Sequence, residues 1–172
     1  MALAQLKQLQ RRSPFPELPA LIAITEHQRQ DFVQVAERLP LESWVIFRDY
    51  EAAQRRGMGA QVARACRRRG LKFLVAGDED LALDLEADGL HCPEHLLKEV
   101  PKLRLKHPTW LFTAACHSAA AVRAASGVHA ALFSPVFPTR SHPSGPTVGV
   151  ERFKEVVRGN PSVPIYALGA LH

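Results

Sequence analysis

The stretch from Ala130 to Gly149 concentrates groups suited to binding an anion. It reads AALFSPVFPTRSHPSGPTVG, an apolar strand that is broken at Pro135 and Pro138 and continues as a polar loop. The loop carries hydroxyl and cationic side chains, with Gly145 for backbone freedom, namely Thr139, Arg140, Ser141, His142, Ser144 and Thr147. Hydroxyls, a guanidinium and free backbone N–H groups on a loop after a buried strand favour phosphate binding. The alternative is an ordinary solvated loop without a function.

His117 lies at the predicted carboxyl end of a strand and carries a side chain able to transfer protons. It follows an apolar run and precedes Ser118, a predicted N-cap of an alanine-rich helix. An imidazole titrates near neutrality and can take a proton from one atom and return it to another. The alternative for His117 is a role in capping that helix. We do not expect a dyad with Cys116, because consecutive strand residues point to opposite faces. His91 is expected to pack at a strand end.

The elements that must position these residues alternate along the chain. Short apolar runs predict strands that are covered on both faces, at Leu21–Thr25, Trp44–Arg48, Lys72–Ala76, Gly89–Cys92, Thr109–Ala115, Ala130–Val136 and Val163–Leu168. Amphipathic runs between them predict helices, at Arg29–Leu39, Glu51–Arg69, Glu79–Glu86, Glu94–His107, Ser118–Ser126 and Val150–Arg158. Gly70 is expected to end the second of these helices and Gly127 the fifth.

Repeated strand–helix units predict a parallel sheet, and seven of them favour an α/β fold of the TIM (β/α) barrel type. The active face of such a barrel lies at the carboxyl ends of its strands. Those ends are expected to carry Thr25, Arg48, Gly77, His91, Cys116 or His117, Thr139 and Gly169.

The pattern stops after the seventh strand, so the eighth strand–helix unit is missing from this sequence. We expect an N-terminal arm over residues 1–20 and a single barrel domain over residues 21–172. Because proteins avoid uncovered strand edges, a neighbouring copy in a homo-oligomer, the arm or the rest of a longer chain is expected to cover the gap.

Composition bounds the function classes. The 172 residues are 47% hydrophobic and 23% charged, as in an ordinary globular domain. The sequence has neither a membrane span nor a secretory signal, and its three cysteines lack metal-type spacing, so we expect a cytoplasmic protein with reduced thiols. The net charge of +5 raises the hypothesis of nucleic-acid binding. We expect none, because the arginine run of residues 64–69 has no interleaved aromatic residues.

Several segments resemble one family, the thiamine phosphate synthases and the related TenI proteins. ADGLHCPEHLL is similar to their GVHLGQEDL segment, TAACHSAAAVRAA to SVHS-E-A and VPIYALGAL to PVVAIGGI. SPVFPTRSH resembles GPVFPTKTK, the most specific of the matches, and WVIFRD resembles the strand that carries QLREK. The matches run in order from about Leu21 to the end. The resemblance implies a (β/α)₈ barrel of thiamine biosynthesis.

The chain departs from this family where the synthases hold the aminopyrimidine pyrophosphate and Mg²⁺. Only Arg48 remains of the QLREK group, and Ala76 and Gly77 replace the Asn-Asp pair of the NDR motif. Leu96 replaces a second carboxylate and His142 replaces a lysine. Mg²⁺ needs oxygen ligands, which alanine, glycine and leucine side chains lack. Asp78 and Glu94 lie one or two residues out of register and are the alternative ligands.

The half that binds the thiazole phosphate in the family is better matched. Thr139 and Ser141 match its two loop hydroxyls, and Gly169 matches the first glycine of its GGI turn, although Ala170 replaces the second. His117 matches the histidine that the TenI proteins use for proton transfer. The resemblance therefore implies a small phosphorylated substrate, a TenI-like tautomerisation of a thiazole phosphate, and no cofactor.

Two alternatives remain. The chain is a degenerate thiamine phosphate synthase that uses Mg²⁺, or a barrel that binds a phosphorylated metabolite without catalysis.

Overall fold

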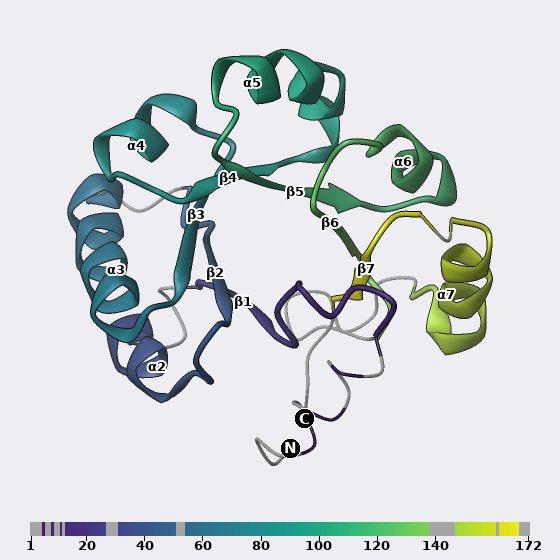
Figure 1. Cartoon of the computed structure of the whole chain (residues 1–172), viewed down its shortest axis with the longest axis horizontal. Helices are drawn as coiled ribbons and strands as arrows, with labels where there is room; N and C mark the ends of the chain where they lie inside the picture. Colours follow the sequence, from purple (N-terminus) through teal and green to yellow (C-terminus); the bar gives the residue numbers. More distant parts are fainter. Residues whose placement is uncertain are drawn as a thin grey trace. The chain divides into compact units, whose positions relative to one another are not determined.

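The computed structural model describes residues 5, 8, 11, 13–26, 31–50, 54–137, 147–160 and 162–168. The chain divides into two compact units, Met1–Leu90 and His91–His172. Strands and helices alternate, and the order of the seven described strands in the sheet follows their order in the chain, β1 to β7 (Figure 1). This alternation is the one expected from the sequence.

The first unit contains three strand–helix repeats and the start of a fourth. Its elements are β1 (Ile22–Ile24), α2 (Phe32–Arg38), β2 (Trp44–Phe47), α3 (Arg55–Arg69), β3 (Lys72–Ala76), α4 (Glu79–Asp84) and the first half of β4 (Gly89–Cys92). β1 and β3 both pair with β2 in parallel, with Ile24 opposite Ile46 and Phe47 opposite Val75. α2 and α3 cover one face of these strands (Figure 1).

The core of this unit explains why its strands are continuous in apolar character. All four residues of β2 and the last four of β3 are buried. α3 meets them with a face of small residues, including Gly59, Val62 and Cys66. A Cβ at Gly59 would lie 2.6 Å from Leu85 Cδ1 and 3.0 Å from Phe47 Cε1, so a larger residue there would have to displace these two buried side chains.

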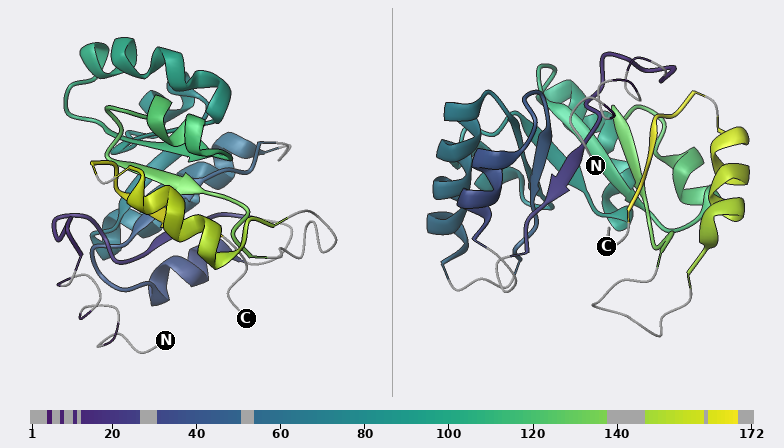
Figure 2. Two further views of the ribbon diagram at one scale, coloured as in Figure 1. Left: turned by 90° about the vertical axis from the view of Figure 1, so that its right-hand side faces the viewer. Right: turned by 90° about the horizontal axis from the view of Figure 1, so that it is seen from below.

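The second unit repeats the pattern. It contains the end of β4, the 3₁₀ helix η1 (Glu94–Glu99), α5 (Val100–Lys106), β5 (Leu111–Cys116), α6 (Ala119–Ala124), β6 (Ala130–Phe133), α7 (Gly149–Arg158) and β7 (Ile165–Ala167). β6 pairs in parallel with β5 and β7, with Cys116 opposite Phe133 and Phe133 opposite Ala167. α7 lies alongside β6 and β7, and Phe153 of α7 contacts Phe133 (Figure 2).

The predicted helix over Glu94–His107 is wrong in one respect. The segment forms two helices, η1 and α5, and the change comes at Val100 and Pro101. Pro101 has no backbone N–H and therefore fits the first turn of a new helix better than the interior of a long one. The predicted strand over Thr109–Ala115 begins two residues later, at Leu111, and extends to Cys116.

The predicted helix ends are largely confirmed. Gly70 is the C-cap of α3 in the left-handed conformation, with φ of 68°. Ser118 is the N-cap of α6, and its hydroxyl accepts a hydrogen bond from the Ala121 amide. α6 ends at Ala124, before Gly127, which has φ of 96° in the turn that leads to β6. Among the described residues, no helix combines the length and apolar character needed to cross a bilayer.

Candidate functional site

His117 stands at the carboxyl end of β5 with its side chain exposed. Its ring Nδ1 lies 3.0 Å from the Ser134 carbonyl oxygen and 3.2 Å from Ser134 Oγ, and Ser134 directly follows β6. The imidazole is therefore held against the end of the neighbouring strand. β5 and β6, which pair in register up to Cys116 and Phe133, bring these two residues together.

The Ser134 carbonyl favours one tautomer of His117. A carbonyl oxygen only accepts hydrogen bonds, so its contact with Nδ1 favours the ring form that carries its proton on Nδ1. In the neutral ring Nε2 then keeps its lone pair and is the basic nitrogen. Among the described residues Nε2 has no hydrogen-bond partner. The unprotonated Nε2 of His117 can therefore act as a base at the carboxyl end of β5.

Glu94 holds the backbone beneath this imidazole. Its Oε2 accepts a hydrogen bond of 2.8 Å from the backbone N–H of His117. Glu94 is the first residue of η1, so this contact ties the segment after β4 to the end of β5. Position 94 was considered above as a replacement metal ligand, but the structure instead gives one of its oxygens to the main chain of His117.

The thiol beside His117 is buried and unreactive. Cys116 is fully buried, and burial together with the Glu94 carboxylate raises its pKa to about 12. A thiol with this pKa is protonated at neutral pH and is a poor nucleophile. The expectation that Cys116 and His117 form no dyad therefore has structural support.

His91, expected above to pack at a strand end, is buried in the second unit. Its Nδ1 lies 2.9 Å from Thr113 Oγ1, and both residues are buried. This contact between β4 and β5 satisfies a polar group inside the core, as a buried imidazole requires. The prediction of a packed histidine is confirmed.

In the first unit the groups at the strand ends bond to one another. Thr25 is buried, its hydroxyl donates to Asp49 Oδ2 at 2.5 Å, and its oxygen accepts from the Arg48 backbone N–H at 3.0 Å. This positions the turn after β2 and leaves the Arg48 residue exposed. Thr25 was expected at the mouth of the barrel, but its hydroxyl serves this internal network.

Arg55 occupies the carboxyl end of β3. Its Nη1 pairs with Asp78 Oδ2 at 2.7 Å and its Nη2 donates to the Ala76 carbonyl at 2.8 Å. The guanidinium carbon also lies 5.9 Å from the Phe47 ring centre and 5.3 Å from that of Tyr50. The Arg55 side chain is only 17% exposed, so this cation is built into the fold.

Asp78, considered from the sequence as a replacement metal ligand, is already bonded within the fold. Asp78 uses Oδ2 for Arg55 and Oδ1 to cap the Leu81 amide at 2.9 Å, so both oxygens are committed. Ala76, Gly77 and Leu96 offer no side-chain oxygen. No group of three or more His, Cys, Asp and Glu residues in the described part of the chain is arranged to hold a metal.

The other predicted phosphate ligands lie outside the described residues. They are the loop residues Thr139, Ser141 and His142, and Gly169 after β7. They remain predictions from the sequence.

Comparison with known proteins decides the family. A family model described as thiamine monophosphate synthase (TMP-TENI) matches residues 21–172. The chain belongs to the thiamine monophosphate synthase family. The resemblance seen in the sequence motifs is thereby confirmed.

Individual relatives agree with this assignment. The chain is 29% identical to a putative thiamine-phosphate synthase 2 of Aquifex aeolicus, over 90% of this chain and 87% of that protein. It is 30% identical to a thiamine-phosphate synthase of Helicobacter pylori, over 66% of this chain and 53% of that protein. The chain thus spans about half the length of the second relative.

Solved structures confirm the fold. A thiamine phosphate pyrophosphorylase from Pyrococcus furiosus superposes with a TM-score of 0.69 at 21% identity, over 88% of this chain and 75% of that one. An HpcH/HpaI aldolase from Desulfitobacterium hafniense gives 0.59 at 15% identity, over 88% and 78%. The α/β barrel class is therefore right, with seven parallel strands in the sheet, of which the first six are each followed by a described helix. Likeness to proteins with such different names supports the fold and not an activity.

Sequence reasoning missed the part that two residues play at strand ends, one in each unit. Ser134 stands in the quoted SPVFPT segment, yet it was treated as part of a strand over Ala130–Val136; β6 ends at Phe133. A polar residue just before a proline is a signal that a strand is ending. Arg55 lies inside the predicted helix over Glu51–Arg69, and only its contact with Asp78 shows that its side chain reaches the carboxyl end of β3.

Proposed function

We propose that this protein binds a thiazole phosphate and moves a proton on its ring, as a TenI-like tautomerase that needs no metal. The observation that supports the proposal is the His117 imidazole, exposed at the end of β5 with Nδ1–H held on the Ser134 carbonyl. Membership of the thiamine monophosphate synthase family supports the thiazole as the substrate class.

His117 performs both halves of the reaction in this proposal. Nε2 takes a proton from one ring position of the thiazole tautomer, and the electrons of that bond move into the ring. The imidazolium then returns the proton at a second position, which yields the aromatic isomer with no change in composition. Nδ1–H stays on the Ser134 carbonyl throughout, so the ring keeps its orientation in both charge states.

The phosphate is assigned to the loop after β6 and to the turn after β7. Thr139, Ser141 and Gly169 are proposed ligands because they match the family motifs, and His142 is a further one because it stands where the family has a lysine. Hydroxyls and glycine amides are suited to phosphate oxygens because they donate hydrogen bonds. Arg48, which is exposed after β2, is a further proposed anion ligand on the same grounds.

A metal-free reaction agrees with the residues at the end of β3. The Arg55 guanidinium neutralises Asp78 there, and Ala76 and Gly77 carry no ligand oxygen. A tautomerisation needs only proton transfer, whereas synthesis of thiamine phosphate requires the pyrophosphate and Mg²⁺ that the family motif implies. We also propose a cytoplasmic location, which the three free, buried cysteines support.

Calorimetric titration separates this function from the synthase. The thiazole phosphate and the aminopyrimidine pyrophosphate with Mg²⁺ are added separately. We expect heat of binding from the first ligand only. Binding of the second would overturn the metal-free proposal, and binding of neither would overturn the substrate class.

Proton transfer itself is tested by hydrogen–deuterium exchange on the thiazole phosphate, followed by NMR. His117→Ala is expected to slow the reaction by about 10²–10⁴-fold, the range for loss of a general acid–base. The matched control is His95→Ala, which removes another exposed histidine of the same unit and is expected to react at the normal rate. Equal rates for the two variants would contradict the role of His117.

A further inference from the structure

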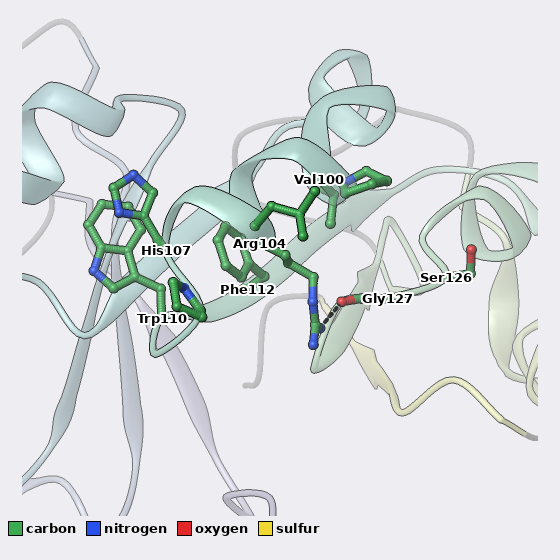
Figure 3. Close-up of a pocket in the computed structure, with 10 residues that line it drawn as sticks. Val100, Arg104, His107, Trp110, Phe112, Ser126 and Gly127 are labelled. Atoms are coloured by element: carbon green, nitrogen blue, oxygen red, sulfur yellow. Dashed lines mark hydrogen bonds between the residues drawn. The ribbon is translucent and has the colours of Figure 1, made fainter.

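The second unit contains a cavity at the opposite end of β5 from His117. Its volume is about 550 Å³, within the usual range for a small-molecule site. It is lined by α5, the turn before β5, the start of β5 and the turn after α6 (Figure 3). The residues that characterise it are Val100, Arg104, His107, Trp110, Phe112 and Ser126.

One end of this cavity is aromatic. The rings of His107 and Trp110 stack with centres 3.9 Å apart and planes 10° from parallel. Phe112 continues the surface, with its ring centre 6.4 Å from that of Trp110. The stack holds the indole in one orientation, so a ligand ring would meet a surface that is already formed. Figure 3 shows this pair on one side of the cavity, with Phe112 between it and Arg104.

The other end of the cavity is cationic. The Arg104 guanidinium donates a hydrogen bond to the Gly127 carbonyl, beside Ser126. A guanidinium has five N–H donors in a fixed fork, so one bond to a carbonyl anchors it and leaves others for an anion. No Asp or Glu is found among the described residues that line the cavity, so these residues do not compensate the charge of Arg104.

The positive charge of Arg104 acts on the nearby imidazole of His129. Burial is the main cause that lowers the pKa of His129, and the positive charge of Arg104 lowers it further. His129 Nδ1 accepts a hydrogen bond from the backbone N–H of Phe112, a residue that lines the cavity. The local field therefore favours negative charge.

We infer that this cavity binds a small amphipathic anion, an arylalkyl carboxylate whose ring packs near Trp110 and whose carboxylate pairs with Arg104. The inference rests on the combination of a fixed aromatic surface, an anchored guanidinium and a lining without carboxylates. It does not depend on the activity proposed for His117, because the two sites lie at opposite ends of β5.

The test uses 4-phenylbutyrate as the probe and 4-phenylbutyramide as its neutral match. Trp110 is one of two tryptophans, and the other, Trp44, is buried, so the indole N–H signals in an NMR titration report the site separately. We expect the carboxylate to shift the Trp110 signal in a saturable way. The amide is expected to bind about tenfold more weakly, because it cannot form the charge-assisted bonds.

Two arginine variants test whether the charge of Arg104 binds the carboxylate. Arg104→Gln is expected to reduce carboxylate affinity about tenfold and to abolish the preference over the amide. Arg123→Gln removes an exposed arginine from α6 and is the matched control, expected to bind as the unchanged chain does. His117→Ala is expected to bind equally well, which separates this cavity from the proposed catalytic site.

Several results would overturn the inference. Equal affinity for carboxylate and amide in the unchanged chain would show that charge plays no part, whatever the variants do. Absence of any saturable shift would show that there is no site. A Trp110 shift that depends on protein concentration without ligand would show that a second copy of the chain covers this face.

Discussion

The strand ends of the two units treat their ionisable groups in opposite ways. In the first unit the terminal nitrogens of Arg55 bond to Asp78 and to the Ala76 carbonyl at the end of β3. In the second, His117 is bonded through one ring nitrogen among the described residues, and its side chain is exposed at the end of β5. Both sites follow buried parallel strands, so the backbone does not account for the difference.

The comparison teaches that position at a strand end does not make a residue available for chemistry. Asp78 is in the place where a metal ligand was considered, yet a cation and a helix cap consume both of its oxygens. His117 keeps a titratable nitrogen because its neighbours, Ser134 and Glu94, bind Nδ1 and the main chain instead. Substitutions in each unit test this difference between the two strand ends.

Among variants that keep the His117 imidazole, the largest effect is expected at Glu94, which positions His117 without touching its ring in any described bond. Glu94→Ala removes the acceptor for the His117 backbone N–H and is expected to lower kcat for thiazole exchange about 10–100-fold, through misplacement of the base. Glu94→Gln keeps an oxygen in place and should stay within about threefold of the normal rate.

The control for this series is Glu99→Ala, an exposed residue at the other end of η1. Hydrogen exchange of the His117 amide gives a readout without substrate and should rise in Glu94→Ala alone. Unchanged kcat and unchanged amide exchange in Glu94→Ala would show that the Glu94 bond positions nothing.

In the first unit, Asp78→Asn should affect stability and leave proton transfer unchanged. Asparagine can still cap α4, but it leaves the Arg55 guanidinium, 17% exposed, without its ionic partner. We expect a loss of about 1–3 kcal/mol in the free energy of unfolding, measured with urea. Asp80→Asn, at an exposed position of the same helix, is the control. A variant at Asp78 that is as stable as the control would mean that the pair is dispensable.

Two glycines of α3 should respond in opposite directions. Gly59→Ala places a Cβ 2.6 Å from Leu85 Cδ1 and is expected to destabilise the chain by about 1–2 kcal/mol, because both neighbouring side chains are buried. Gly57 has no atom within 4 Å of its Cβ position, so alanine there should gain about 0.5–1 kcal/mol of helix propensity. Thermal unfolding of the pair measures both signs. Stabilisation by Gly59→Ala would contradict the close packing of α3 on β2.

The smallest effect is a dependence of stability on pH through His129. Burial, followed by the charge of Arg104, lowers its pKa from the ordinary value of 6.5. The folded chain therefore favours the neutral imidazole more than the unfolded chain does. The resulting stability is complete above pH 6.5 and is lost as the pH falls through that value toward the lowered pKa.

Asparagine separates this effect from packing, since Oδ1 in His129→Asn can accept the Phe112 N–H without titrating. This variant should lose less stability between pH 7 and pH 5 than the unchanged chain, as measured by Tm. His95→Asn, at an exposed position, is the control. The same pH slope in all three proteins would show that His129 does not contribute.

Much of the fold could be predicted because buried parallel strands leave a strong apolar signal. β3, which runs over Lys72–Ala76, and β4, over Gly89–Cys92, have the predicted bounds, since both lie between turn residues and helical patterns. The prediction of one helix over Glu94–His107 was wrong because the helical periodicity of its apolar residues continues across Pro101, where the chain changes from η1 to α5. Apolar spacing does not report how tightly a helix is wound.

The sequence by itself determined the family, the alternation of strands and helices and the residue types at each strand end. His117 and Asp78 could both be placed at such ends, because local pattern and short-range turn chemistry decide where a strand stops. Only the tertiary structure decided what each of them binds. Arg55 meets Asp78 across 23 positions of the chain, and Ser134 meets His117 across 17. Such pairs form through packing of elements that are distant in sequence, and no local pattern encodes which donor meets which acceptor.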